Sequence, residues 1–275
     1  MVKTSQTTSK KTQSEAFHIK NLVLTLSLKA QVGHIGSALS VADILAVLYF
    51  GVLQVRPRQP NWLLRDRFIL SKGHAANALF CTLFRKGFFD RKTLNSYCQN
   101  NGMLGVHPEH HTAGVELSTG SLGHGLGVAV GMALAAKMDG RKYKTYVLIS
   151  DAECNEGEIW QAALVAAHHK LNNLVVIIDY NKQQAFGATD EVLGLEPLND
   201  KWQSFGWTVS ETDGHNHEQL LKTFASQNHT KPHAVIARTI RGKGISFMEH
   251  KTEWHYNTVT KDQYNQARKE LRHAK

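Results

Sequence analysis

Two polar residues follow strand-like apolar segments and could together hold a metal ion. Asp151 follows the apolar run 146–149, and Asn181 follows the run 174–178 after two intervening residues. The segment 158–171 between them has the pattern of one helix, so both strands run in the same direction. The carboxyl ends of parallel strands meet at the edge where open α/β sheets bind ligands. We therefore expect Asp151 and Asn181 to lie side by side.

One carboxylate, one amide oxygen and a backbone carbonyl form a partial oxygen shell for Mg²⁺, which phosphate oxygens and water usually complete. A diphosphate brings its own negative charge, so a single carboxylate is enough. The same two residues also fit a structural interpretation, in which Asp151 caps the following helix and Asn181 forms a turn. Spacing alone slightly favours that second interpretation.

A glycine-rich run over 120–127 leads into a helix-like segment of small residues over 128–138. Glycines let the backbone approach a ligand, and a helix N-terminus can face an anion. The run does not follow a strand directly, so it is a poor match to a dinucleotide-binding fingerprint. Tight packing of a small-residue helix is the competing explanation.

Several histidines stand in turn-like segments, where they could donate hydrogen bonds or carry protons near neutral pH. They are His34, His74, His107 and His255. The cluster of His107, His110 and His111 with Glu109 superficially resembles a zinc site. Its spacing matches no helical His-x-x-x-His pattern, so we do not expect zinc.

The elements that must position these residues alternate between strands and helices. The strand-like segments are 67–70, 146–149, 174–179, 207–209 and 234–237, and helices are expected at 16–31, after Ser40, from 74 toward 85, at 158–171 and at 218–225. Such alternation predicts a mostly parallel α/β sheet with right-handed crossovers. We expect one domain over residues 16–275. Residues 1–15 are rich in Ser, Thr, Gln and Lys and are expected to form a disordered tail without a secretory signal.

Composition limits the function classes. The chain has 275 residues, 42% of them hydrophobic and 20% charged, which is globular rather than disordered. No apolar run is judged long enough to cross a bilayer. The net charge of +9 suggests an anionic partner, but the basic residues are scattered, so solvated surface charge is favoured and neither nucleic acid nor a membrane is expected. Cys81, Cys98 and Cys154 form no CxxC pair, which fits a reducing cytoplasm.

Taken together, these segments resemble the N-terminal, thiamine diphosphate-binding domain of transketolase from about residue 16 to about residue 258. The resemblance is closest to families in which transketolase is split into two chains. Its motifs, whose joint order is more specific than any single one, are Gly33–Ser37, Asp66–Ala75, Gly120–Gly125, Ser150–Ala162, Asp179–Asn181, Phe205–Trp207, Asp213–His215, Arg241–Gly244 and Trp254–His255.

The resemblance implies roles for individual residues. Asp151, Asn181 and the main-chain carbonyl of Gln183 would hold Mg²⁺ on the diphosphate. The implied cofactor-binding residues are Ser37, His74, Gly120, Ser121, Leu122, Asp151, Ala152, Glu156, Asn181, Arg241 and His255. The implied catalytic residues are His34, His74, His107 and His255, which would line the sugar channel or contact the cofactor. Glu156 would also lie at a subunit contact.

The resemblance also implies the fold and the reaction. The fold would be α/β, with a parallel sheet flanked by helices on both faces, as in the diphosphate-binding domains of thiamine diphosphate enzymes. A separate C-terminal, pyrimidine-binding subunit would complete the site in a heterotetramer and supply a glutamate to the aminopyrimidine ring. The reaction would move a two-carbon ketol unit from a ketose to an aldose, both sugars or sugar phosphates.

Three departures from the family pattern leave alternatives open. Ala152 stands where glycine is usual, His124 where glutamine is usual, and Arg241 where lysine is usual. Ala152 is the best support for the alternative of a degenerate, non-catalytic scaffold or regulatory subunit. A deoxyxylulose-phosphate synthase or a ketoacid dehydrogenase component is a further alternative, which the motifs 241–244 and 254–255 disfavour. The alternative that the chain binds nucleic acid is supported by its net charge alone.

Overall fold

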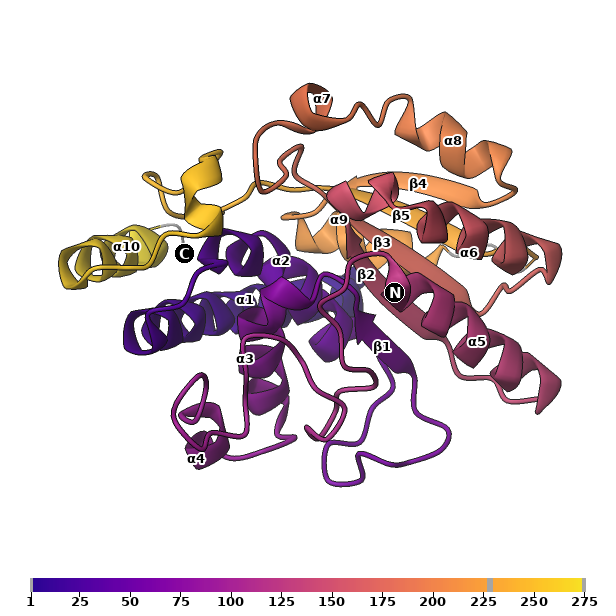
Figure 1. Cartoon of the computed structure of the whole chain (residues 1–275). Coiled ribbons are helices and arrows are strands. Elements are labelled where there is room, and N and C mark those ends of the chain that lie inside the picture. The colour runs from indigo at the N-terminus through magenta and orange to yellow at the C-terminus, as the bar shows by residue number, and fades with distance from the viewer. Residues whose placement is uncertain (1, 227–229, 274–275) are drawn as a thin grey trace.

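The central sheet consists of parallel strands only. The computed structural model describes residues 2–226 and 230–273 (Figure 1). The strands in this part of the chain are β1 (Arg67–Leu70), β2 (Thr145–Ser150), β3 (Leu174–Tyr180), β4 (Thr208–Asp213) and β5 (His233–Arg238). Their order across the sheet is β1-β2-β3-β5-β4, and every neighbouring pair is parallel. The predicted fold class is confirmed.

Helices cover both faces of the sheet (Figure 1). One face carries α1 (Val2–Ala30), α2 (Ile35–Val47), α3 (Ala76–Lys86), α9 (His217–Ala225) and α10 (Lys261–His273). The other face carries α5 (His124–Met138), α6 (Gly157–His168) and α8 (Leu198–Ser204). The short elements are the π-helix η1 (Leu48–Val52), α4 (Arg91–Leu94), α7 (Thr189–Val192) and the 3-10 turns η2 (Gly73–Ala75), η3 (Ala152–Asn155) and η4 (Thr252–His255).

Alternation along the strands explains the two layers. In β3, Val175 and Ile177 pack into the core beneath α1 and α2, whereas Val176 and Ile178 pack into the core beneath α5 and α6. Because both faces are covered, the strand is apolar at nearly every position, which is why its sequence is so distinctive. The polar residues of the site are therefore confined to the strand ends.

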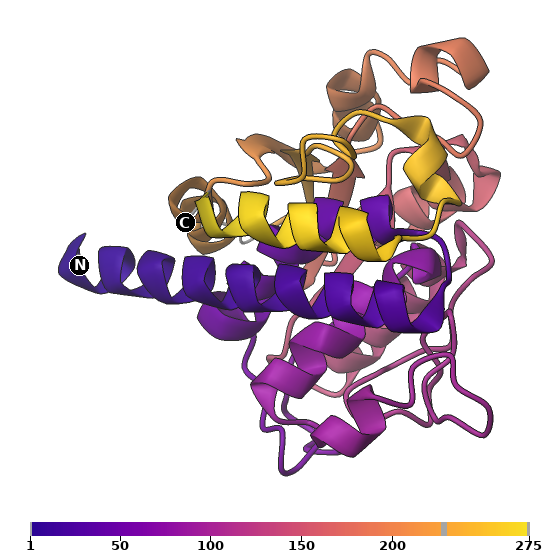
Figure 2. The ribbon, with the colours of Figure 1, turned by 90° about the vertical axis from the view of Figure 1, so that its left-hand side faces the viewer.

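The expected disordered tail over residues 1–15 is wrong. The chain is helical from Val2, and α1 lies antiparallel to α10 (Figure 2). Ser9 and Thr12 are buried, and Glu15 accepts a hydrogen bond from Arg85 Nε at 2.8 Å. The first half of the helix uses small hydroxyl residues at its buried positions, so no apolar periodicity marks it. Residue 1 lies outside the described residues.

Two expectations about the second helix also need correction. It begins at Ile35 rather than after Ser40, and every residue of Ile35–Val47 is buried. The continuous segment Ile35–Val52 has a mean hydropathy of 1.9 over 18 residues, so one helix does have the length and composition to cross a bilayer. Because 83% of that segment is buried, its apolar character is explained by its position in the core between α1 and α3.

Candidate functional site

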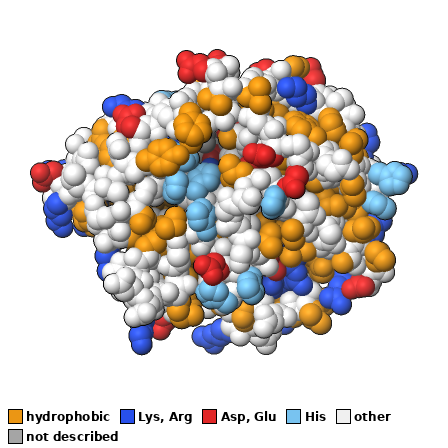
Figure 3. Space-filling view, in the orientation of Figure 1, with side chains coloured by type: hydrophobic (Ala, Val, Ile, Leu, Met, Phe, Trp, Pro, Cys, Tyr) orange, Lys and Arg blue, Asp and Glu red, His pale blue; other side chains and the backbone are white. Residues whose placement is uncertain are grey.

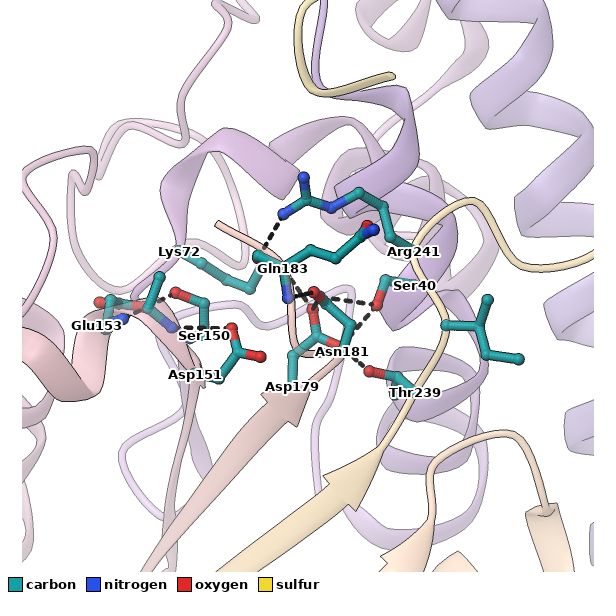
Figure 4. A network of polar contacts seen from close by, with 12 residues as sticks. Ser40, Lys72, Ser150, Asp151, Glu153, Asp179, Asn181, Gln183, Thr239 and Arg241 are labelled. Carbon is teal, nitrogen blue, oxygen red and sulfur yellow. Dashed lines mark hydrogen bonds and ion pairs between the residues drawn. The ribbon is translucent and has the colours of Figure 1, made fainter. Parts of the chain in front are cut away.

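Asp151 and Asn181 meet at the carboxyl edge of the sheet, as predicted. The register of β2 and β3 pairs Ser150 with Asp179, which brings the two following segments together (Figure 4). Asp151 is fully buried. Its Oδ1 accepts from the backbone N–H of Ala152 at 2.8 Å, and its Oδ2 accepts from that of Lys182 at 2.6 Å. The Asp151 carboxylate therefore spans the ends of both strands.

Asn181 is oriented by its neighbours. Its amide Nδ2 donates to Asp179 Oδ2 at 3.1 Å, so Oδ1 is the atom turned the other way, where it accepts from the backbone N–H of Gln183 at 3.0 Å. The cap at Asp151 and the turn at Asn181, which the structural interpretation expects, are thus both present. These hydrogen bonds leave further lone pairs on the Asp151 carboxylate and the Asn181 amide oxygen available to a ligand.

A second buried carboxylate, Asp179, has a supporting role that the sequence patterns did not indicate. It forms a fully buried ion pair with Lys72 and accepts from Ser40 Oγ at 2.6 Å and from Thr239 Oγ1. The Asp-x-Asn pattern of the resemblance contains Asp179, but only Asn181 has an implied function there. Lys72 and Asp179 join β1 to β3 directly beneath the candidate site.

The pKa values of the two buried aspartates differ, and this difference bears on cation binding. Burial and the neighbouring Asp179 carboxylate raise the pKa of Asp151 to about 7. Burial opposes ionisation of Asp179 too, but Lys72 and three hydrogen bonds lower its pKa. Lys72 pairs directly with Asp179, whereas Lys72 and Arg241 attract Asp151 only at longer range. Oxygen donors from Asp151, Asn181 and a backbone carbonyl fit Mg²⁺. No cluster of three His, Cys, Asp or Glu side chains suited to a metal occurs in residues 2–226 and 230–273.

A cavity of about 170 Å³ opens beside these oxygens. Its lining includes eight residues that the resemblance assigned to the cofactor or metal, namely Ser37, His74, Leu122, Ala152, Asn181, Gln183, Arg241 and His255. Several buried polar atoms around it have no hydrogen-bond partner within the described chain: Ser37 Oγ, Gln183 Oε1, Arg241 Nε, His34 Nδ1 and His255 Nδ1. Buried polar groups are rarely left unpaired, so their concentration here indicates a polar ligand.

Arg241 faces the cavity but also closes one side of it. Its Nη2 donates to the carbonyl of Gln183 at 2.6 Å and its Nη1 to the carbonyl of Gln184 at 3.0 Å. The Gln183 carbonyl that the resemblance assigns to Mg²⁺ therefore already accepts one hydrogen bond and has a second lone pair available. Arg241 Nε remains unpaired and is a candidate donor to an anionic ligand.

Three histidines form one cluster at the cavity. The ring centroids of His34, His74 and His255 lie 4.8–5.4 Å apart, and Figure 3 shows histidine side chains grouped near the centre of this face. Burial and Arg241 lower the pKa of His255 to about 3. Burial, Lys72 and the neighbouring imidazoles hold the pKa of His74 well below its usual value, and burial and His107 lower the pKa of His34. All three imidazoles are therefore neutral at pH 7.

The predicted site residues outside the cavity lining include four exposed ones, His107, Gly120, Ser121 and Glu156. Gly120, Ser121 and His107 are exposed, and a Cβ at Gly120 would lie 3.3 Å from the His107 ring. Glu156 is exposed before α6, and Gly123, at a φ of 90°, leaves room for its side chain. His124, exposed, pairs with Glu158 at 3.0 Å. The structure does not place these residues in the cavity lining.

Ala152 causes no backbone strain. It lies in the 3-10 turn η3 and does not have a positive φ, so the position does not require glycine. Ala152 is one of the residues that line the cavity. The substitution therefore narrows the cavity slightly without altering the backbone donors around Asp151.

Comparisons with known proteins agree with this geometry. The family model for the thiamine diphosphate-binding domain of transketolase matches residues 12–274. The chain is 46% identical to an apulose-4-phosphate transketolase subunit of Phocaeicola vulgatus, over 88% of this chain and 87% of that protein. It is 41% identical to a 6-deoxy-6-sulfo-D-fructose transketolase subunit of Clostridium sp., over 94% of this chain and 95% of that one.

Full-length transketolases match over only part of their length. The crystal structure of transketolase from Campylobacter jejuni superposes with a TM-score of 0.88 at 29% identity, covering 96% of this chain but 43% of that one. Human transketolase is 36% identical over 87% of this chain and 38% of its own length. The chain thus spans most of the relatives named as subunits and less than half of the full-length proteins.

Proposed function

The chain belongs to the family of transketolase thiamine diphosphate-binding domains, and from that premise we propose that it is the cofactor-binding subunit of a two-component transketolase. The reaction moves a two-carbon ketol unit from a ketose to an aldose. The observation that carries the proposal is the cavity bounded by Asn181 and Arg241, in which unpaired buried polar atoms surround oxygens suited to a divalent cation.

Each side of the cavity offers a distinct contact to Mg²⁺ and the diphosphate. Asp151, Asn181 Oδ1 and the Gln183 carbonyl would hold Mg²⁺, which relieves the repulsion between Asp151 and Asp179. Ser37 Oγ and Arg241 Nε, both buried and unpaired, would donate to phosphate oxygens. When bound, thiamine diphosphate supplies the electron sink for breaking and forming the ketol carbon–carbon bond.

The histidines would orient substrate rather than attract it by charge. Because His34, His74 and His255 are neutral, each imidazole has one N–H donor and one acceptor nitrogen. His34 Nδ1 and His255 Nδ1 are buried without a partner in the described chain, so they are the atoms that would exchange a proton with a substrate hydroxyl. His107, exposed above Gly120, would meet the part of the sugar farther from the cavity.

One outer helix face is suited to a partner chain. On α5, Gly127 and Gly131 are exposed, and a Cβ at either would meet nothing within 4 Å. Glycine destabilises a helix interior by about 0.5–1 kcal/mol relative to alanine, and nothing within the described chain requires it there. Val128 and Met138 on α5 and Leu164 on the neighbouring α6 are also exposed. Figure 3 shows hydrophobic side chains on the part of the surface that α5 and α6 form.

This face, defined by Gly127, Val128, Gly131, Met138 and Leu164, is where we propose that the C-terminal, pyrimidine-binding subunit docks. The helix starts directly after the Gly120–Leu122 segment, so a partner on α5 lies next to the cofactor. The existence of such a partner is supported by the two relatives that are named as transketolase subunits. A heterotetramer of two copies of each chain is the proposed assembly.

The substrates are proposed to be anionic sugars. The same two relatives are named for a ketose phosphate and a sulfonated ketose. Reconstitution tests the whole proposal. The purified chain, the product of an adjacent C-terminal transketolase gene, and their mixture are each supplied with Mg²⁺, thiamine diphosphate and a panel of ketoses. We expect ketol transfer in the mixture only; turnover by either chain alone would contradict the two-component assembly.

A further inference from the structure

The candidate site includes a buried carboxylate, Glu153, to which none of the roles above is assigned. It lies in the turn η3 and is 0% exposed. Its Oε1 accepts from Ser71 Oγ at 2.5 Å and from the backbone N–H of Gly123 at 3.0 Å. Its Oε2 accepts from the backbone N–H of Ser150 at 2.8 Å. All three partners donate to the carboxylate.

These contacts join three segments that bound the candidate site. Ser71 follows β1, Ser150 ends β2, and Gly123 closes the glycine-rich run before α5. Ser71 extends the connection, because its hydroxyl also accepts from the backbone N–H of Gly125 at 3.2 Å. A Cβ at Gly125 would overlap Ser71, so this close approach requires glycine. Glu153 thus ties the first turn of α5 to the strand ends.

We infer that Glu153 is a positioning residue for cofactor binding, an inference that rests on the proposed function. It does not line the cavity. It acts through Gly123 by fixing the Gly120–Leu122 backbone at a set distance from Asp151. At the other end of this segment, Thr119 Oγ1 donates to the carbonyl of Leu70 at 2.7 Å, so Glu153 and Thr119 fix its two ends.

The chemistry of the three contacts requires a carboxylate. An amide at position 153 has one acceptor oxygen and one NH₂ donor. Whichever way the amide turns, its NH₂ group faces at least one N–H or O–H that also donates. Glu153→Gln therefore keeps the size of the side chain but leaves one backbone N–H, of Gly123 or of Ser150, facing a donor. Whichever way the amide turns, the bridge between Gly123 and the end of β2 is broken.

Asp66 provides a matched control. It is also a buried carboxylate that accepts backbone N–H groups, from Gln54 at 2.8 Å and from Lys144 at 2.9 Å. It precedes β1 and thus lies at the opposite end of that strand from Ser71. Asp66→Asn removes a comparable set of bonds far from the Gly120–Leu122 segment.

The experiment uses the complex of this chain with its partner and measures two quantities, the Kd of thiamine diphosphate in saturating Mg²⁺ and the thermal midpoint. We expect Glu153→Gln to raise the Kd at least 10-fold while kcat at saturating cofactor stays within about 3-fold. Asp66→Asn should lower the midpoint similarly and leave the Kd within 2-fold. Equal Kd values for Glu153→Gln and the wild type would overturn the inference.

A second variant covers the case in which Glu153→Gln does not fold. Ser71→Ala keeps the carboxylate and the Gly123 bond but removes the link to Gly125, so the Kd should rise about 3-fold; an unchanged Kd would count against the inference. Failure of the proposed function is distinguishable, because the wild-type complex would then bind no thiamine diphosphate at all.

Discussion

Two fully buried aspartates in this chain have opposite electrostatic environments. Asp43, in α2, accepts from Lys20 Nζ at 2.8 Å, from His215 Nδ1 at 2.7 Å and pairs with His217 Nε2 at 3.2 Å. Burial raises its pKa, but Lys20 and the two histidines outweigh burial and hold that pKa well below its usual value. Every charge in this cluster has a partner within the chain.

Asp151 is also buried, but it forms no direct ion pair in the described chain, where Lys72 and Arg241 attract it only at longer range. It accepts two backbone N–H groups, and its nearest charged neighbours include another carboxylate, so its pKa is raised to about 7. We interpret this difference as a structural role for Asp43 and a ligand-binding role for Asp151. The ion pairs of Asp43 link α1 and α2 to α9, whereas we propose that a bound cation completes the cluster at Asp151.

Neutralising each aspartate is the strongest test of that contrast. Asp43→Asn leaves the partly buried Lys20 without its counter-charge and should destabilise the chain by about 3 kcal/mol. Asp151→Asn turns its NH₂ group toward one of the two backbone N–H donors, so it should cost about 1–3 kcal/mol, less than Asp43→Asn. It should also weaken Mg²⁺ and thiamine diphosphate binding at least about 100-fold. Urea unfolding and calorimetric titration measure the two effects.

The distinction between Asp43 and Asp151 would be wrong if the two variants had the same effects on stability and cofactor affinity. A marked loss of metal-free stability in Asp151→Asn, with cofactor affinity preserved, would make Asp151 a structural residue like Asp43. Asp43→Asn serves as the control for folding, because neither Asp43 nor its three partners line the cavity.

The outer surface offers a parallel comparison between α5 and other exposed apolar positions. Gly131→Glu places a charged side chain where the structure leaves open space, so the isolated chain should fold normally. Association with the partner chain should weaken by about 30-fold or more, the effect of a central interface position. Leu63→Asp, at a residue 61% exposed outside this face, is the control. Equal affinities for both variants in sedimentation or surface-binding assays would exclude α5 as the docking face.

Proton linkage distinguishes the two aspartates in a third way. Because the pKa of Asp151 is raised in the folded state, the metal-free fold binds a proton more tightly than the unfolded chain, so Asp151 makes stability fall as pH rises from about 4 to about 7. Asp43 changes stability with pH in the opposite direction. Its contribution is present above its unfolded pKa near 4 and is lost only as pH falls further.

The proposed binding of Mg²⁺ to the ionised form of Asp151 predicts that Mg²⁺ affinity rises by up to about tenfold per pH unit below pH 7 and levels off above it. Titrations in buffers of different ionisation enthalpy should show about one proton released at pH 6. A pH-independent affinity, with no proton released, would show that Asp151 is already ionised in the metal-free chain.

The smallest effect is expected at the unusual alanine. Ala152→Gly removes a methyl group from the cavity lining without changing a backbone conformation that alanine already adopts. The Kd of thiamine diphosphate should change by less than about threefold, since one exposed methyl group contributes little. A much larger gain in affinity or turnover would revive the interpretation of the chain as a degenerate scaffold.

Sequence patterns predicted the features that depend on local periodicity. The buried strands were apolar throughout, and the β-α-β unit placed Asp151 beside Asn181 because parallel strands share an edge. The first half of α1 was missed because its buried positions are Ser9 and Thr12, which show no apolar periodicity.

Polar pairs between residues far apart in the sequence could not be predicted from it. Lys72 and Asp179 are separated by 107 positions, and Glu153 reaches back 82 positions to Ser71. Nothing in the local spacing indicates such partners, although a charged residue directly after a buried strand is a signal that could be followed. The resemblance identified most of the cavity lining, but the residues that orient it emerged only from the three-dimensional structure.

The most direct test locates the metal. Crystals of the complex with its partner chain, grown with thiamine diphosphate and with Mn²⁺ in place of Mg²⁺, would reveal the ion by its anomalous scattering. The account predicts one strong peak per copy of this chain, coordinated by Asp151, Asn181 Oδ1 and the Gln183 carbonyl, and no peak in the Asp151→Asn variant. A peak elsewhere, or none between those oxygens while the cofactor is bound, would contradict it.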